Sequence, residues 1–393
     1  AFGESLRVAG MDACHLKTKY GGVLLVLTAL DGNMNIFPVC VGIAEGECIE
    51  SWTWFLRNVS LSLGIGEGAG IVILSDMEKG IERAVSNVLP QAAHGYCLVH
   101  IERNFVKKFK TDMDKFLWRA AKCPTKVEFD AYMNTLRNFN TKAAAYVESI
   151  PTERWARWDF KARRFGHLSS NIAESTNAWL EDSRSLNPTQ LICCFVRKVN
   201  VLFHGRRLMY SSMDPNALPY NIASTLSKTI EKGRRLKVVQ NSEKDFEVQN
   251  STDSPDFRVV DIDSFTCSCG LPQETSLPCK HLSAALMFLE RDPRDTVPEM
   301  MRAGTLTRVY RGSITPVDTT TLEDDGLQQP AVRRGRGRPK VKRIRSAIEH
   351  AHRRTVTCGR CGKPGHNAKT CTSTGVQAAT DGLLSQPSHH SIE

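Results

Sequence analysis

The sequence lacks any run of about 18 consecutive apolar residues, the length that a membrane-spanning helix needs, so we expect no membrane span and no membrane partner. It also lacks a recognisable secretory signal at its N-terminus. Residue 1 is alanine rather than methionine, and the first predicted strand follows almost at once, which is consistent with a fragment of a longer protein.

The pattern of a disulfide scaffold is missing as well. The chain has 13 cysteines, an odd number, and six of them fall into two metal-ligand patterns, so we predict a reducing compartment. The net charge of +10 is unevenly placed, because residues 331–354 hold eight Arg and two Lys against one Glu. A polyanionic partner is therefore expected mainly at this basic tail.

With 393 residues, 41% of them hydrophobic, the chain is long enough for more than one domain and has ample material for a core. Two apolar, β-branched segments, residues 6–12 and 70–76, each end in an aspartate and predict buried strands. Asp12 and Asp76 would then lie at the rim of one sheet, where two carboxylates can share divalent metal ions. The alternative is that each aspartate caps the helix that follows.

The segments around these two acids complete a recognisable order of elements. Residues 23–43 predict a hairpin with a turn at residues 31–33, and residues 50–63 and 78–89 predict amphipathic helices that cover the sheet. A short strand is expected at residues 96–99. Residues 101–167 follow as an α-helical insertion whose basic and aromatic end could line a DNA channel or form an ordinary solvated helix face.

Four short motifs carry a resemblance to a known family: residues 10–15 (GMDACH), 19–22 (KYGG), 74–76 (LSD) and 97–100 (CLVH). Together with the order of elements, they resemble the Mutator-like (MULE) transposase domain over about residues 1–180. The resemblance implies an α/β fold with an RNase H-like mixed sheet and an α-helical insertion. It also implies that Glu174, in the block Asn-x-x-Glu-Ser-x-Asn after the insertion, is the third catalytic acid, for which a surface glutamate is the alternative.

By this resemblance, Asp12, Asp76 and Glu174 would hold two Mg²⁺ or Mn²⁺ ions for metal-dependent cleavage and strand transfer of DNA. The partners implied are double-stranded DNA, both element terminal repeats and target DNA, with a homo-oligomer as the active form. Members of the family also carry the pair Cys97 and His100, which is expected either to bind metal or to brace the fold.

Two cysteine–histidine patterns predict structural zinc sites. Cys267, Cys269, Cys279 and His281 form a Cys-x-Cys…Cys-x-His set whose three thiolates and one imidazole leave no open position on zinc. This set resembles the SWIM zinc finger. The second pattern has the Cys-x2-Cys-x4-His-x4-Cys spacing of a zinc knuckle, a module that often binds single-stranded nucleic acid, and consists of Cys358, Cys361, His366 and Cys371.

Between the two zinc patterns lies a basic segment with an Arg-Gly-Arg-Pro core that resembles an AT-hook. Glycine and proline keep such a segment thin enough for the minor groove of A·T-rich DNA. The candidate DNA-binding residues are Arg334, Arg336, Arg338 and Lys340. A nuclear-import signal is the alternative, and a nuclear location is expected under either interpretation.

The sequence thus predicts an RNase H-like α/β domain followed by small zinc-binding modules and a basic, largely disordered tail. The expected divisions are a transposase domain (1–210), a helical connector (211–245), a SWIM-type finger (246–290), a linker (291–330), an AT-hook-like segment (331–346), a zinc knuckle (356–373) and a disordered tail (374–393). The expected function is that of a DDE-type transposase. The alternatives are a domesticated DNA-binding transcriptional regulator without catalysis and, third, an RNA-binding protein that uses the knuckle.

Overall fold

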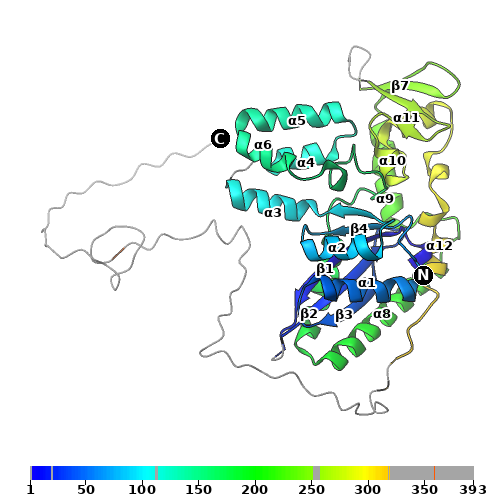
Figure 1. Cartoon of the computed structure of the whole chain (residues 1–393). Helices are drawn as coiled ribbons and strands as arrows, with labels where there is room; N and C mark the ends of the chain where they lie inside the picture. The colour runs from blue at the N-terminus through cyan, green and yellow to red at the C-terminus, as the bar shows by residue number, and fades with distance from the viewer. Residues whose placement is uncertain are drawn as a thin grey trace, which may run out of the picture. The chain divides into compact units, whose positions relative to one another are not determined.

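A computed structural model describes residues 2–18, 21–110, 114–250, 257–316, 318 and 358. The first part of the chain forms a five-stranded sheet in the order β3-β2-β1-β4-β5 (Figure 1). Its strands are β1 (Val8–His15), β2 (Val23–Leu30), β3 (Ile36–Ala44), β4 (Val72–Ser75) and β5 (Ala93–Tyr96). The β1–β2 and β2–β3 pairs are antiparallel, whereas β1–β4 and β4–β5 are parallel. The sheet is therefore mixed, as the α/β prediction requires.

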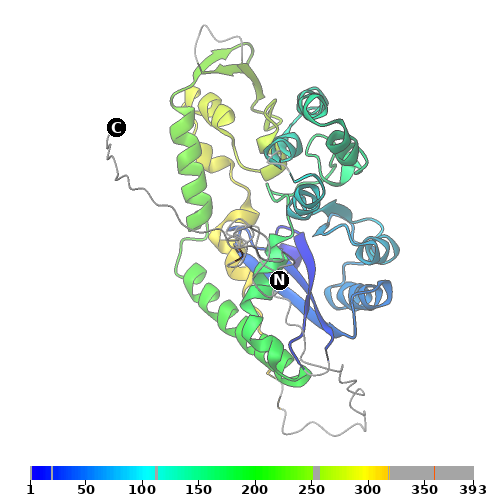
Figure 2. The ribbon, with the colours of Figure 1, turned by 90° about the vertical axis from the view of Figure 1, so that its left-hand side faces the viewer.

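Helices cover both faces of this sheet. The helices α1 (Ile49–Leu63) and α2 (Lys79–Val88) bury Trp52, Phe55 and Val85 in the core on one face. The helices α7 (Asn171–Trp179) and α8 (Pro188–Ser211) lie on the other side, as the blue and green helices of Figure 2 show. Because side chains alternate along a strand, Val8 and Gly10 face α7, whereas Ala9 and Met11 face α1 and α2.

Gly10 allows α7 to lie directly against the centre of the sheet. A Cβ atom at this position would stand 3.1 Å from the backbone nitrogen of Ala173 and 3.4 Å from the Cβ atom of Ile172. The hydroxyl of Thr28 on β2 also donates to the hydroxyl of Thr176 at 2.8 Å, in a buried contact. These contacts hold helix α7, which carries Glu174, in a defined position over β1 and β2.

The segment between β5 and α7 is helical and has its own core. It contains α3 (Leu98–Phe109), α4 (Asp114–Lys122), α5 (Lys126–Phe139) and α6 (Thr141–Glu148), followed by the 3-10 turn η2 (Thr152–Arg154). Apolar residues of these elements, including Phe105, Leu117 and Trp155, form a separate buried cluster. The strand before it runs over Ala93–Tyr96 rather than residues 96–99, because Cys97 already caps α3.

A second sheet, in the order β6-β7-β8-β9, follows the long helix α9 (Tyr220–Gly233). Its strands are β6 (Lys237–Gln240), β7 (Asp245–Gln249), β8 (Phe257–Asp261) and β9 (Thr266–Cys267). Helices α10 (Leu271–Thr275) and α11 (Lys280–Phe288) complete this module, and α11 closes its small core through Leu282 and Leu286. The module begins before residue 246, because β6 lies in the segment predicted as a helical connector.

The residues after α11 return to the first sheet. Residues 291–310, predicted as the start of a linker, instead form η4 (Pro293–Thr296), η5 (Glu299–Met301) and α12 (Ala303–Val309). Leu306, Val309 and Tyr310 are fully buried, and the Tyr310 hydroxyl donates to Asp31 at 2.8 Å. Asp31 sits in the turn between β2 and β3, so this segment is tied to the centre of the domain.

Two short 3-10 turns remain, η1 (Phe2–Glu4) and η3 (Glu181–Ser185). In the part of the chain that the structure describes, no helix combines the length and apolar character needed to cross a membrane. Contacts divide the chain into two units, residues 1–332 and 333–393. The fold described above belongs to the first unit.

A buried ion pair joins the second sheet module to the helical insertion. Arg164 Nε lies 3.7 Å from Glu274 Oε1 on α10, and the two side chains are only 1% and 9% exposed. Burial lowers the pKa of Arg164 to about 10, and the charge of Glu274 opposes this shift. Nearby, the backbone N–H of Phe165 donates to the Glu274 carbonyl at 3.2 Å.

We expect Glu274→Gln to lower the free energy of unfolding by about 3 kcal/mol, because it leaves the buried Arg164 guanidinium without its counter-charge. Replacing both partners by methionine should restore most of this loss. The control is Glu128→Gln, which breaks the half-exposed 3.1 Å pair with Arg258 and should cost less than about 1 kcal/mol. Urea denaturation measures the free energy of unfolding of Glu274→Gln, the double methionine variant and Glu128→Gln. Equal losses for Glu274→Gln and the double variant would contradict the view that the unpaired charge of Arg164 causes the loss.

Candidate functional site

Asp12 and Asp76 come from neighbouring parallel strands. Val8 and Gly10 of β1 pair with Val72 and Leu74 of β4, and each aspartate lies two residues beyond the last of these pairs. Asp12 is not at the exit of its strand, since β1 continues to His15 by pairing with β2. It is nevertheless at the rim toward β4, because β4 ends at Ser75. Alternation places Asp12 on the α7 side, like Gly10.

Helix α7 brings Glu174 to the same side of the sheet. Asn177, one turn further along α7, donates from its Nδ2 to Asp12 Oδ2 at 2.7 Å. The negative charge of Glu174 is also among the causes that raise the pKa of Asp12. Asp12 and Glu174, which are 162 positions apart in the sequence, are therefore electrostatic neighbours. The sequence motif contained Asn177, but gave no indication that it holds Asp12.

Both aspartates have a raised pKa, because burial at this rim disfavours their ionised form. Burial, and next the charge of Glu174, raise the pKa of Asp12 to about 6 from the ordinary 3.8. Burial also raises the pKa of Asp76, although the backbone N–H of Glu78, which donates to Asp76 Oδ1 at 3.1 Å, opposes the shift. A positive charge nearby would therefore stabilise the ionised form of both carboxyl groups in the folded protein.

His100 is the positive group shared by all three acids. Its Nε2 lies 4.0 Å from Glu174 Oε1, and its charge opposes the raised pKa of both Asp12 and Asp76. The pKa of His100 is itself raised, first by the Cys97 thiol and then also by the charge of Asp76. Cys97 is fully buried at the N-cap position of α3, three residues before His100.

Sequence reasoning missed two further charged residues at this rim. Arg103, one turn after His100 on α3, places its Nη1 3.3 Å from Glu174 Oε1. Glu47, in the loop between β3 and α1, has its pKa raised to about 7, by burial first and then by the charges of Asp76, Glu78 and Asp12. Neither lies in a motif; the spacing of three between His100 and Arg103 was the signal available for the arginine.

Asp12→Asn should stabilise the protein when no Mg²⁺ or Mn²⁺ is added. A carboxyl whose pKa rises on folding stabilises the fold below its unfolded pKa, near 3.8, and this contribution is lost as pH rises through about 6. At pH 7.5 the variant should therefore gain about 2–3 kcal/mol over the natural chain, and little at pH 4. Urea denaturation at the two pH values checks this; an equal difference at both would contradict it.

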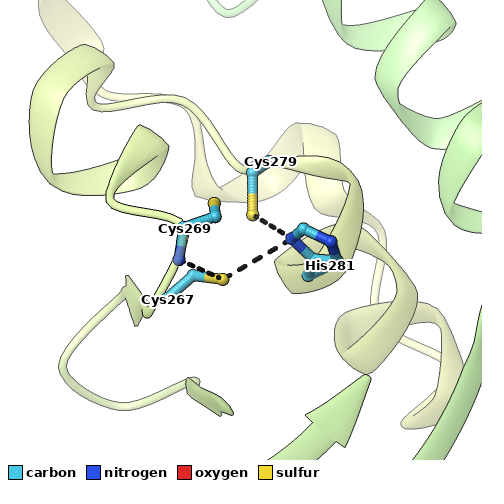
Figure 3. Close-up of side chains that lie close together, drawn as sticks. All are labelled: Cys267, Cys269, Cys279 and His281. Carbon is cyan, nitrogen blue, oxygen red and sulfur yellow. Dashed lines mark hydrogen bonds between the residues drawn. The ribbon is translucent and has the colours of Figure 1, made fainter. Parts of the chain in front are cut away.

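The second candidate site is the Cys–His cluster of the second module (Figure 3). The ligand atoms of Cys267, Cys269, Cys279 and His281 all lie within 4.8 Å of one another. His281 Nδ1 stands 3.7 Å from Cys267 Sγ and 3.8 Å from Cys279 Sγ. These distances suit the edges of a tetrahedron with zinc–ligand bonds of about 2.0–2.3 Å. The cluster can therefore bind a metal ion such as zinc.

Local structure explains why the four ligands converge. Cys267 ends β9, and Cys279 and His281 occupy the start of α11. The backbone N–H groups of Cys269 and Leu282 donate to Cys267 Sγ and Cys279 Sγ, each at 3.4 Å. The thiols of Cys267 and Cys279 lower the pKa of Cys269, which favours the thiolate form that binds metal.

The carboxylates of Asp12, Asp76 and Glu174 do not converge as closely as the ligand atoms of the Cys–His cluster. Within the described residues, the Cys–His cluster is the one group of three or more His, Cys, Asp or Glu side chains whose ligand atoms lie close enough to hold an ion. Binding of an ion by Asp12, Asp76 and Glu174 would thus require their side chains to move together. The Arg103–Glu174 pair is one contact that such a movement would change.

The predicted sites of the tail lie outside the described residues, apart from Cys358, which is buried. They are Cys361, His366 and Cys371 of the zinc knuckle and Arg334, Arg336, Arg338 and Lys340 of the AT-hook-like segment. These assignments stay predictions.

The fold is a mixed α/β domain with a group of acids at the rim of its sheet. Residues 8–104, which span β1 to the middle of α3, match the family model of the MULE transposase domain. This match confirms, over residues 8–104, the resemblance to the MULE transposase domain that the sequence motifs predicted.

Two curated proteins are similar to larger parts of the chain. Protein FAR1-related sequence 4 of Arabidopsis thaliana is 21% identical over 210 residues, which are 51% of this chain and 28% of the plant protein. The transposase for insertion sequence element IS1201 of Lactobacillus helveticus is 26% identical over 146 residues, 37% of this chain and 33% of the bacterial protein. The chain thus covers about a third or less of the length of these relatives.

Proposed function

We propose that the chain is the catalytic part of a Mutator-like DDE transposase with an RNase H-like sheet, which cleaves and joins DNA phosphodiesters. The observation that carries this proposal is the arrangement around His100. Asp12, Asp76 and Glu174 come from β1, the end of β4 and α7, and all three interact with this one imidazole. The sheet order β3-β2-β1-β4-β5, with the first three strands antiparallel, supports the RNase H-like assignment.

The donor set at the rim fits a hard divalent cation. Three carboxylates and no thiolate suit Mg²⁺ or Mn²⁺, whereas the Cys–His cluster suits Zn²⁺. When bound, Mg²⁺ or Mn²⁺ would supply Lewis-acid activation of the attacking oxygen and charge stabilisation at the leaving oxygen. Asp12 and Asp76 would act from rigid strands, and Asn177 would hold the Asp12 carboxylate in its orientation at 2.7 Å.

We propose a structural role for the zinc site of the second module and a nucleic-acid-binding role for the tail. Four protein ligands at the Cys–His cluster leave no open position for a substrate on zinc. The basic segment and the zinc knuckle would add contacts to double-stranded DNA and to single-stranded nucleic acid in a nuclear protein that works as a homo-oligomer. These assignments rest on the sequence patterns of residues 331–373.

Arg103 should weaken the binding of the ion at the acids. Its guanidinium, 58% exposed, neutralises Glu174 at 3.3 Å and repels a cation. We therefore expect Arg103→Ala to raise the affinity for Mn²⁺ by about two- to fivefold, in line with the ~0.2–1 kcal/mol of an exposed ion pair. Titration of free Mn²⁺ followed by electron paramagnetic resonance measures this. Lys107→Ala, one turn further along α3, is the control, and equal affinities of all three proteins would contradict the expectation.

The experiment that tests the function is a DNA cleavage assay on the full chain with supercoiled plasmid and with oligonucleotides that carry the element ends. We expect nicking and strand transfer with Mg²⁺ or Mn²⁺ and none without an added divalent ion. Binding of the cognate ends without metal-dependent cleavage would contradict the proposal.

That negative outcome would favour the second candidate function, a domesticated DNA-binding regulator without catalysis. The observation on its side is the Arg103–Glu174 pair, which occupies the third acid with a protein cation. The two candidates differ in one measurable property, which is metal-dependent cleavage. Both should bind DNA without the three acids, but only a transposase should cleave DNA when the acids are present.

A further inference from the structure

A hollow lies at the opposite end of the first sheet from the acids. It has a volume of about 750 Å³ and opens beside the N-terminal ends of β1, β4 and β5, where Leu6, Ile71 and Ala93 form part of its wall. The loop before α7 and the turn η5 with α12 close its sides. A hollow of this size falls in the range of ligand sites, about 300–1,000 Å³.

The rim of this hollow carries cations that are available to a ligand. Arg7, Lys161 and Arg163 line it and are exposed. Among the described residues, no acid forms an ion pair with Arg7 or Arg163, and Lys161, 83% exposed, has Asp159 at 3.4 Å. Arg163 donates to the neutral hydroxyl of Ser276 at 3.1 Å.

The two acids of the rim share one cation. Glu4 and Glu299 both pair with Arg308, at 3.5 Å and 3.1 Å. The lining holds two acids against four cations, which are Arg7, Lys161, Arg163 and Arg308, so the mouth of the hollow has a net charge of +2, which favours an anionic ligand.

The hollow also has apolar surface and unusual backbone. Ala162, Phe165 and Met300 line it between the cations. Arg7 and Phe165 have φ values of 55° and 52°, in the left-handed region that non-glycine residues rarely adopt. Such a conformation costs on the order of 1–3 kcal/mol and tends to occur at ligand sites. Here it occurs twice in one hollow, at one cation and at the aromatic ring.

We propose that this hollow binds one nucleotide, with its base against Phe165, Ala162 and Met300 and its phosphate between Arg7, Lys161 and Arg163. A flat apolar base that carries an anionic phosphate matches apolar walls with a cationic rim. The choice of a nucleotide over other anions rests on the proposed function, since the same domain would act on DNA. The nucleotide can belong to a single strand of DNA or be free in solution.

The position of the hollow separates it from the cleavage site. Arg7 directly precedes β1 and Asp12 is the fifth residue of that strand, so the two are separated by about 17 Å at ~3.3 Å per residue. A nucleotide bound here is thus not the one whose phosphodiester is cut. In a DNA strand, it would lie a few nucleotides away and would fix the register of the strand across the sheet.

The test measures binding in the Asp76→Asn background without added Mg²⁺, so that cleavage does not interfere. The probes are a fluorescent single-stranded oligonucleotide, a 2′-deoxynucleoside 5′-monophosphate and inorganic phosphate. Arg7→Glu and Arg163→Glu should each weaken oligonucleotide binding at least tenfold, whereas Arg57→Glu, an exposed arginine of α1, should change it less than threefold. Thermal melting verifies that each variant is folded.

Phe165→Leu separates base recognition from simple charge attraction. We expect it to weaken oligonucleotide binding about three- to tenfold and to leave the binding of inorganic phosphate unchanged. Binding of the monophosphate with the same dependence on Arg7 identifies a site for free nucleotide; binding of the oligonucleotide alone identifies a strand site.

The inference is overturned if Arg7→Glu, Arg163→Glu and Phe165→Leu all bind the oligonucleotide like their parent protein. This failure is distinct from failure of the proposed function. If the natural chain cleaves DNA with metal and these three variants bind the oligonucleotide normally, only the nucleotide site is refuted. If the variants lose binding and the natural chain does not cleave DNA, only the proposed function is refuted.

Discussion

Asp76→Asn should abolish metal-dependent DNA cleavage while leaving DNA binding intact. Asparagine keeps the size of the side chain but removes the negative charge at the end of β4, where the chain offers a carboxylate on the strand next to Asp12. We expect a loss on the order of 1,000-fold in the cleavage rate, which corresponds to about 4 kcal/mol of transition-state stabilisation. The rate is measured on supercoiled plasmid in Mg²⁺ and again in Mn²⁺.

The controls for this prediction come from the same chain. Glu174→Gln should lose cleavage to a similar extent, because Glu174 faces the same imidazole as Asp76 does. Asp182→Asn makes the same chemical change at an exposed acid of η3 and should keep cleavage within about threefold. A cleaving Asp76→Asn variant, or equal losses in Asp76→Asn and Asp182→Asn, would refute the assignment of the acid.

Cys279→Ser should unfold the second module. Cys279 supplies one of four converging ligands, so its loss removes the metal, whereas a serine at this position can still accept the capping hydrogen bond from Leu282. Structural zinc contributes on the order of 10–16 kcal/mol of binding energy in small zinc modules, far more than this core alone supplies. Hydrogen exchange should show loss of protection over residues 237–288, and mass spectrometry of metals should show one zinc equivalent fewer.

Cys48→Ser is the matched control, because Cys48 is an exposed cysteine before α1. It should keep both the zinc content and the protection of the module. Because Arg164 and Glu274 join the module to the helical insertion, partial loss of protection around residue 164 is also expected in Cys279→Ser. Retention of the metal by Cys279→Ser would show that Cys279 is not a ligand.

The parts of the fold that sequence predicted best are those with strong local signals. The apolar runs and the Asp-Gly-Asn turn indicated β2 and β3, and the Cys-x-Cys…Cys-x-His pattern indicated the ligands of the cluster. Asp12 was placed at the exit of its strand, because the residues after it are less apolar. In the structure, pairing with β2 carries β1 on to His15, a long-range contact that composition does not reveal.

Contacts between distant segments account for most of what the sequence did not predict. Residues 291–310 looked like a linker because they are polar overall, yet Leu306, Val309 and Tyr310 pack against the first sheet. Glu47 and Arg103 join the candidate site only because the loop before α1 and the first half of helix α3 lie at the same rim. The raised pKa of Glu47 and the Arg103–Glu174 ion pair both depend on that folding, and the spacing from His100 was a signal for Arg103 alone.

The most direct test of the central claim locates Mn²⁺ in crystals of the chain by its anomalous scattering. We expect density between the carboxylates of Asp12, Asp76 and Glu174, with Glu174 turned away from Arg103. This peak should vanish in Asp76→Asn crystals, while the scattering of zinc at Cys267, Cys269, Cys279 and His281 remains. Mn²⁺ density elsewhere, with Glu174 still paired to Arg103 and the rim of the sheet devoid of metal, would contradict the account.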